Sequence, residues 1–241
     1  KNRGTAMGKY FGTDGFRGEV NVALTARHAY EIGRFIGWYF TKKRRGVKNE
    51  DGEIRSRVVI GKDPRLSSYM YEYALSAGLT ASGADACLLH VTTTPSVSYV
   101  TRTEDFDCGI MISASHNPYT DNGIKIFDAL GGKADERLID LIETHLAAVD
   151  ADRRRAFPTR LRKRRPLVDL LPGITVISAT SFPFEGLLPR SKIGLDCADG
   201  NAFYCKAYSI RSAPQRKPSA SPDGRNINLG CGSSPKRWRG A

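Results

Sequence analysis

A short segment with two serines, a histidine and an asparagine holds the residue types best suited to chemistry in this chain. Residues 113–118 read Ser-Ala-Ser-His-Asn-Pro and lie between two expected strands, where loop side chains are free to meet a ligand. A hydroxyl such as that of Ser115, held at the tip of a rigid loop, can carry a phosphoryl group when neighbouring donors stabilise the transferring group. Lys125, ten residues further along, could return to the same space as a proton donor or acceptor. The alternative is an Asx or ST turn, in which these side chains only satisfy the loop backbone.

Two further segments combine glycine with cations. Residues 11–18 read Phe-Gly-Thr-Asp-Gly-Phe-Arg-Gly, in which the glycines allow close backbone approach to a ligand and Arg17 offers a planar fork suited to phosphate. Residues 61–65 read Gly-Lys-Asp-Pro-Arg and place Lys62 and Arg65 directly after an expected strand, where ligands of α/β proteins usually bind. A surface turn with a solvated Arg17, and a turn with an internal ion pair at 61–65, are the alternatives.

Hydrophobic periodicity predicts the elements that position these residues. Thr25 is expected to cap a helix that runs to about residue 43, and Ser67 or Ser68 a second helix that runs to about residue 82. Thr94-Pro95 opens a third helix, and 135–149 forms a fourth, with Leu141 among its inward residues. The expected strands are 58–60, 84–90, 108–112 and 124–127. Strands separated by helices of this length predict an α/β layer architecture.

Composition excludes several classes of protein. The chain has 241 residues, 40% of them hydrophobic, which is normal for a globular protein and rules out wholesale disorder. It has no run of apolar residues long enough for a transmembrane helix, so we expect no membrane partner. Five scattered cysteines without CxxC spacing favour free thiols in a reducing compartment over a disulfide framework or a zinc site.

The positive charge is confined to one end of the chain. Residues 1–150 carry 19 basic and 19 acidic side chains, whereas residues 151–241 carry 18 basic and 6 acidic ones, which accounts for the whole net charge of +12. A basic segment of this kind could be a nucleic-acid-binding tail or simply a solvated stretch. Because aromatic side chains are nearly absent from its first basic cluster, we do not expect nucleic acid as a partner.

Taken together, these segments resemble the α-D-phosphohexomutases. The resemblance rests on the opening at residues 7–18, on 60–65, on Thr93-Thr-Pro95, and on the Ser-His-Asn-Pro loop followed by Asp-Asn-Gly-Ile-Lys at 121–125. The Gly-Thr-Asp-Gly-Phe-Arg-Gly opening is more similar to the phosphoglucosamine mutase branch than to the phosphomannomutase/phosphoglucomutase branch. The resemblance implies a three-layer helix-sheet-helix domain for residues 1–150.

The resemblance also implies a phosphoserine mechanism in the cytoplasm. Ser115 would carry the phosphoryl group, with Mg²⁺ bound through its phosphate, while His116 and Asn117 organise the loop. Lys125 would be an acid/base residue, and Arg17 would support the phosphoserine. The substrate would be a hexosamine phosphate, and glucosamine 6-phosphate and glucosamine 1-phosphate would be interconverted through a bisphosphate on the route to cell-wall precursors. The alternatives are phosphomannomutase or phosphoglucomutase activity, or a non-catalytic fragment with a basic nucleic-acid-binding tail.

The resemblance weakens after residue 150. We expect a basic irregular linker at 151–190, and a partial second α/β domain at 191–241 that begins with a strand at 193–197. The family's Asp-Gly-Asp-x-Asp-Arg loop, which supplies three metal-binding carboxylates, is not found in the 241 residues, so we expect this chain by itself to be inactive or nearly so. Short segments that resemble the family alternate here with Arg/Ser/Pro-rich stretches that do not. This pattern suggests reading-frame slips in the coding sequence, a hypothesis that sequencing of the encoding DNA would test.

Overall fold

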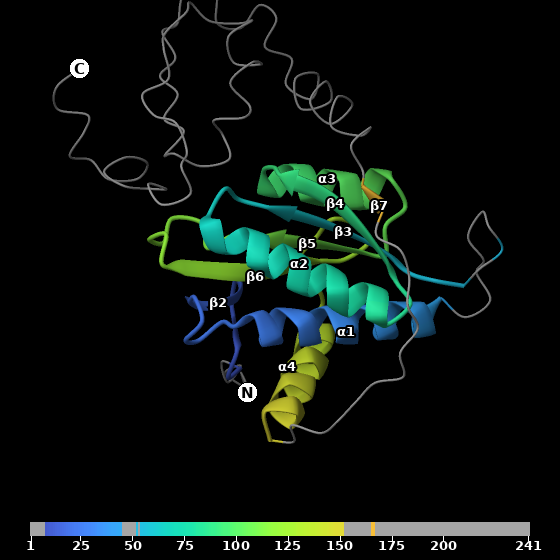
Figure 1. Cartoon of the computed structure of the whole chain (residues 1–241). Helices are drawn as coiled ribbons and strands as arrows, with labels where there is room; N and C mark the ends of the chain where they lie inside the picture. The colour runs from blue at the N-terminus through green and yellow to red at the C-terminus, as the bar shows by residue number, and fades with distance from the viewer. Residues whose placement is uncertain (1–7, 45–51, 53, 152–164, 167–241) are drawn as a thin grey trace, which may run out of the picture.

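The computed structural model describes residues 8–44, 52, 54–151 and 165–166 (Figure 1). The expected strand at 193–197 and the expected second domain lie outside the described residues. So does the expected linker, apart from Ala151 and residues 165–166. The candidate site residues all lie within the described part of the chain.

A mixed sheet forms the middle layer, with strands in the order β1-β2-β6-β5-β3-β4-β7. Central β3 pairs in parallel with both β4 and β5, and β6 runs antiparallel to β5 and to β2. The strands are β1 (Phe11–Gly12), β2 (Gly15–Glu19), β3 (Arg57–Lys62), β4 (Asp85–Val91), β5 (Cys108–Ile112), β6 (Asp121–Phe127) and β7 (Arg165–Pro166). The carboxyl ends of β3, β4 and β5 therefore meet at one edge of the sheet, where the loop after β5 begins.

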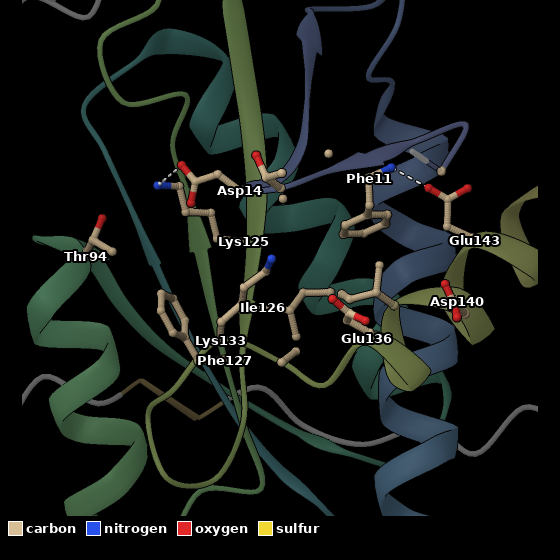
Figure 2. A pocket seen from close by; sticks show the side chains of 16 residues that line it. Phe11, Asp14, Thr94, Lys125, Ile126, Phe127, Lys133, Glu136, Asp140 and Glu143 are labelled. Atoms are coloured by element: carbon tan, nitrogen blue, oxygen red, sulfur yellow. Dashed lines mark hydrogen bonds and ion pairs between the residues drawn. The ribbon is translucent and has the colours of Figure 1, made fainter. Parts of the chain in front are cut away.

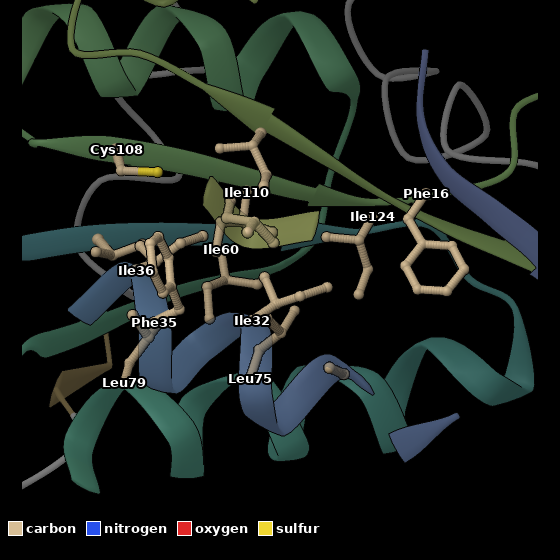
Figure 3. Packing of buried hydrophobic residues seen from close by; sticks show 14 of the residues in the cluster. Phe16, Ile32, Phe35, Ile36, Ile60, Leu75, Leu79, Cys108, Ile110 and Ile124 are labelled. Atoms are coloured by element: carbon tan, nitrogen blue, oxygen red, sulfur yellow. The ribbon is translucent and has the colours of Figure 1, made fainter. Parts of the chain in front are cut away.

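Helices cover both faces of the sheet, which confirms the three-layer α/β fold (Figure 1). They are α1 (Ala26–Lys43), α2 (Leu66–Ala81), α3 (Thr94–Thr103) and α4 (Glu136–Ala151). Val58 and Ile60 of β3 point to one face and pack with α1, α2 and α4, whereas Val59 points to the other face and packs with α3. Figure 3 shows the larger of these cores, in which Ile110 and Ile124 of the sheet meet Ile36 and Leu75 of the helices.

The expected helix starts are right for three helices and wrong for one. Thr25 caps α1, and its Oγ1 accepts a hydrogen bond from the backbone N–H of His28 at 3.2 Å. The start of α2 is not capped by Ser67 or Ser68, because the cap position is Arg65 and no side chain caps it. The Ser68 hydroxyl instead donates a hydrogen bond to the Asp63 carboxylate, at 2.7 Å.

One inward residue of α4 was also predicted wrongly. Leu138, Ile142, Leu146 and Val149 are buried, but Leu141 is 46% exposed. The buried side chains of α4 thus follow a narrower stripe than the sequence periodicity indicated, and Leu141 lies outside it. No helix in the described part of the chain has both the length and the apolar character to cross a bilayer.

Candidate active site

The loop after β5 presents Ser115 to solvent in an unusual backbone conformation. Ser115 is exposed and has a φ of 57°, in the left-handed region that non-glycine residues rarely adopt. Its backbone N–H donates to the Ser113 hydroxyl at 3.0 Å, and its carbonyl is held from inside the protein. Such strain persists only where the surroundings enforce it, and it concentrates at functional sites. His116, next in the chain, is exposed as well.

Arg65 is the group that enforces this loop conformation. Its side chain is fully buried, and its guanidinium donates to the backbone carbonyls of Ser115 and Asn117, each at 3.0 Å. It also donates to the carbonyls of Asp121, at 3.0 Å, and of Pro118. Asp63 completes the arrangement by accepting from Arg65 Nε at 2.8 Å. The donors of Arg65 are thus turned inward onto four loop carbonyls, and its binding of a phosphate stays a prediction.

Two asparagines fix the loop at its far end. Asn117 is half-buried and donates through Nδ2 to the Asp121 carboxylate at 2.8 Å. Asn122 is fully buried and donates to the hydroxyls of Ser67 and Ser68, at 2.8 and 3.0 Å. Asn117 thus joins two residues of the loop segment through its side chain, and the contacts of Asn122 were not predicted from the sequence.

Lys62 does not reach the site that the sequence suggested. Its side chain is 1% exposed, and its Nζ lies 2.6 Å from Glu72 of α2, which is also completely buried. The same Nζ lies 3.5 Å from the centre of the Tyr69 ring. Lys62 is therefore one half of a buried ion pair with α2, whereas the ion pair inside residues 61–65 that the alternative interpretation expected is that of Asp63 with Arg65.

Arg17 and Lys125 meet beside the loop, at the junction of β2 and β6. Both contact one oxygen of Asp14, Lys125 Nζ at 3.0 Å and Arg17 through Nη2. Burial lowers the pKa of the Lys125 ammonium, and the neighbouring charge of Arg17 lowers it further. The structure thus unites two predicted residues with an acidic one that sequence reasoning did not single out.

Gly123 allows the Ser115 loop to lie against Arg17. A Cβ at position 123 would come within 2.7 Å of the Ser113 carbonyl oxygen and 3.0 Å of Arg17 Cγ. We therefore expect Gly123→Ala to push the loop and Arg17 apart and to lower the free energy of unfolding by about 1–3 kcal/mol, the usual range for overpacking. Urea denaturation measures the change, and Gly132→Ala, whose added Cβ would have no neighbour closer than 3.4 Å, is the matched control. Equal effects of the two substitutions would contradict this view of the junction.

A pocket of about 460 Å³ adjoins Lys125 and Asp14 (Figure 2). Its walls come from the β1–β2 turn, β6, the start of α3 and the first half of α4, with Phe11, Ile126 and Phe127 as apolar lining. Ser115 is not among its lining residues. Lys125 and Asp14 therefore link this pocket to the arginine beside the Ser115 loop.

The residues near Ser115 do not provide a complete Mg²⁺ site. Mg²⁺ prefers an octahedral set of oxygen ligands. Within residues 8–44, 52, 54–151 and 165–166 no three His, Cys, Asp or Glu side chains are arranged to hold a metal ion. The nearby Asp121 carboxylate already accepts from Asn117. A bound Mg²⁺ would need more ligands than these residues offer.

Comparison with known proteins places this geometry in context. Residues 8–153 match the family model for phosphoglucomutase/phosphomannomutase, alpha/beta/alpha domain I. The chain is 51% identical over 236 residues to a phosphoglucosamine mutase of Lachnospira eligens, and 48% identical over 235 residues to one of Lachnoclostridium phytofermentans. Each alignment covers 95% of this chain and 49% of the relative, so the chain spans about half the length of the curated relatives it matches.

A solved structure supports the fold. A phosphoglucomutase/phosphomannomutase family protein from Burkholderia thailandensis superimposes with a TM-score of 0.66 at 20% identity, over 91% of this chain and 46% of that one. At this level of identity the likeness concerns the fold alone.

Proposed function

Because the chain belongs to the phosphoglucomutase/phosphomannomutase family, we propose that Ser115 carries a phosphoryl group and exchanges it with a hexosamine phosphate. The observation that carries this proposal is the exposed, left-handed Ser115, whose loop is held by the buried Arg65. A loop fixed in this way presents its hydroxyl without further reorganisation, which is what transfer to and from a fixed nucleophile requires. The names of the two relatives at 48–51% identity support glucosamine phosphates as the substrates.

The proposed reaction consists of two phosphoryl transfers in opposite directions. In the first, the bond between phosphorus and Ser115 Oγ breaks while a bond forms to the free hydroxyl oxygen of glucosamine 6-phosphate. That hydroxyl gives up its proton, and Ser115 Oγ takes one up. In the second, the bond between phosphorus and the 6-oxygen of the resulting bisphosphate breaks while a bond forms to Ser115 Oγ. Ser115 Oγ gives up its proton and the 6-oxygen takes one up, which leaves glucosamine 1-phosphate and phosphorylated Ser115.

The chain's own cations fit the charge that these transfers involve. Arg17 lies beside the loop, separated from it only by Gly123, and supplies positive charge for the phosphoryl oxygens. Lys125, whose pKa is lowered by burial and by Arg17, is the candidate for holding or releasing the proton. In the proposal, Mg²⁺ would supply further charge neutralisation at the phosphate when bound.

Direct phosphorylation of the loop tests the proposal. The 241-residue chain is incubated with glucosamine 1,6-bisphosphate and Mg²⁺, and the peptide that contains Ser115 is analysed by phosphopeptide mass spectrometry. Labelling needs only the single transfer to Ser115 and not full turnover, so we expect phosphate on Ser115 in the wild type even where turnover is nearly absent, and none anywhere in Ser115→Ala. Thr120→Ala is the matched control, because it removes another exposed hydroxyl from the same loop, and it should be labelled like the wild type. Phosphate on another residue, or no phosphate at all, would contradict the proposal.

The same measurement separates the two candidate substrate classes. Labelling is compared between the 1,6-bisphosphates of glucosamine, glucose and mannose at equal concentration. We expect the glucosamine compound to label Ser115 fastest. Faster labelling by glucose or mannose bisphosphate would favour phosphoglucomutase or phosphomannomutase activity instead.

A further inference from the structure

Asp14 stands between the two cations of the site. It lies in the tight turn between β1 and β2, and one of its oxygens contacts both Lys125 Nζ, at 3.0 Å, and Arg17 Nη2. The contact with Lys125 joins residues that are far apart in the sequence, and Figure 2 shows this pair. Nothing in the proposed transfers has so far used this carboxylate.

The turn that carries Asp14 is held against β6 by its backbone. Gly15 has a φ of 95°, and a Cβ there would come within 2.4 Å of the Ile124 carbonyl oxygen. Only glycine permits this approach. Since Ile124 immediately precedes Lys125 in β6, this backbone approach brings the turn that carries Asp14 close to Lys125.

The charges around Lys125 make its protonation depend on the contact with Asp14. The Lys125 side chain is 16% exposed, and the guanidinium of Arg17 disfavours its charged form. In the described part of the chain, Asp14 is the only carboxylate within ion-pairing distance of Lys125. The other charged groups that line the same pocket are Lys133, Glu136, Asp140 and Glu143.

One donor of the Arg17 guanidinium has no acceptor in the described residues, although another donor contacts Asp14. Its Nε is buried and has no hydrogen-bond acceptor within the described residues. A buried donor without a partner is costly unless a ligand or water completes it. Within the described residues this donor is left without an acceptor, while Asp14 contacts the other end of the guanidinium.

We propose that Asp14 is a positioning residue, a role that rests on the proposed function: its carboxylate holds the Lys125 ammonium charged and fixed beside Arg17. Lys125 then has a proton to give to the oxygen from which the phosphoryl group departs. Asp14 itself touches neither substrate nor phosphate.

Titration of Lys125 tests this role without any need for turnover. The full chain is labelled with isotopically coded acetic anhydride over a pH series, and acetylation of the Lys125 peptide is followed by mass spectrometry. In Asp14→Asn the loss of negative charge lowers the pKa of Lys125, so its labelling at a given pH below the midpoint rises about 5-fold. This factor corresponds to about 1 kcal/mol for a partly exposed ion pair. A change in the pKa of Lys125 moves the midpoint of the pH dependence. A change in the access of acetic anhydride to Lys125 would alter the labelling rate at every pH and leave the midpoint in place.

Three controls sharpen the result. Asp140→Asn removes a carboxylate from the same pocket with no contact to Lys125, and it should leave the midpoint unchanged. Asp14→Glu should restore the midpoint most of the way. Lys62, which is 1% exposed, reports folding in the same sample because it stays protected only while the chain is folded.

The outcomes separate this proposal from the proposed function. A wild-type midpoint in Asp14→Asn, or an equal shift in Asp140→Asn, overturns the role of Asp14 even when Ser115 is phosphorylated. Absence of phosphate on wild-type Ser115 together with the expected shift in Lys125 overturns the reaction instead, and the electrostatic contact stands.

Discussion

Replacing Arg65 by Met is expected to lower the free energy of unfolding by about 3–5 kcal/mol, because it leaves a buried charge without its partner. Asp63 is 1% exposed and would lose its contact with Arg65 Nε at 2.8 Å. The loop carbonyls can turn to water, but the Asp63 carboxylate cannot. The change is measured by urea unfolding followed through circular dichroism. Arg137→Met, at an exposed position of α4, is the matched control and should change the stability by no more than about 0.5 kcal/mol.

Arg65→Lys separates the stability of the fold from the shape of the loop. A lysine can keep the ion pair with Asp63, but it lacks the planar fork that donates to the carbonyls of Ser115 and Asn117 at the same time. We therefore expect Arg65→Lys to recover much of the unfolding free energy that Arg65→Met loses. Ser115 of this variant should nevertheless accept phosphate from the bisphosphate more slowly than in the wild type. Wild-type labelling in this variant would mean that the loop holds its conformation without Arg65.

Much of the fold was predictable, because burial dictates its pattern. Val58, Val59 and Ile60 form a continuous apolar run, as expected for a strand covered on both faces, and the structure buries all three completely. Thr25 and Thr94-Pro95 start helices where their capping chemistry indicated. The start of α2 was missed because two serines near a helix start predict a cap, and the chain uses one of them, Ser68, to bind Asp63 instead.

The candidate site was predictable only where the residues act close to one another in the sequence. The loop around Ser115 consists of residues that are contiguous in the sequence, so their residue types alone indicated a candidate site. The contact of Lys62 with Glu72 was not foreseen, because Glu72 lies on the buried side of α2 and cations after a strand usually meet ligands. A glutamate on the apolar side of a helix is the signal that could have revealed an internal ion pair. Asp14 was missed because its contact with Lys125 exists only after β2 pairs with β6.

Replacing Lys62 by Met is expected to cost about 3–5 kcal/mol of unfolding free energy, because it leaves the fully buried Glu72 carboxyl without its charged partner. Another neighbour of that carboxylate is His90, whose Nδ1 lies 3.3 Å from Glu72 Oε1 and forms an ion pair with it only when the imidazole is protonated. Urea denaturation of the single variant measures the loss. Lys133→Met, at an exposed position, is the matched control.

The double variant Lys62→Met/Glu72→Leu distinguishes an internal ion pair from a ligand-binding lysine. When both charges are removed, no buried charge is left without a partner, so the free energy of unfolding should return close to that of the wild type. Because neither side chain reaches the Ser115 loop, bisphosphate should still phosphorylate Ser115 in the folded double variant at the wild-type rate. A stable double variant that no longer accepts phosphate would instead return Lys62 to the phosphate-binding role that its position after β3 suggested. An unstable one would mean that the ion pair stabilises the chain beyond the cost of burying its two charges.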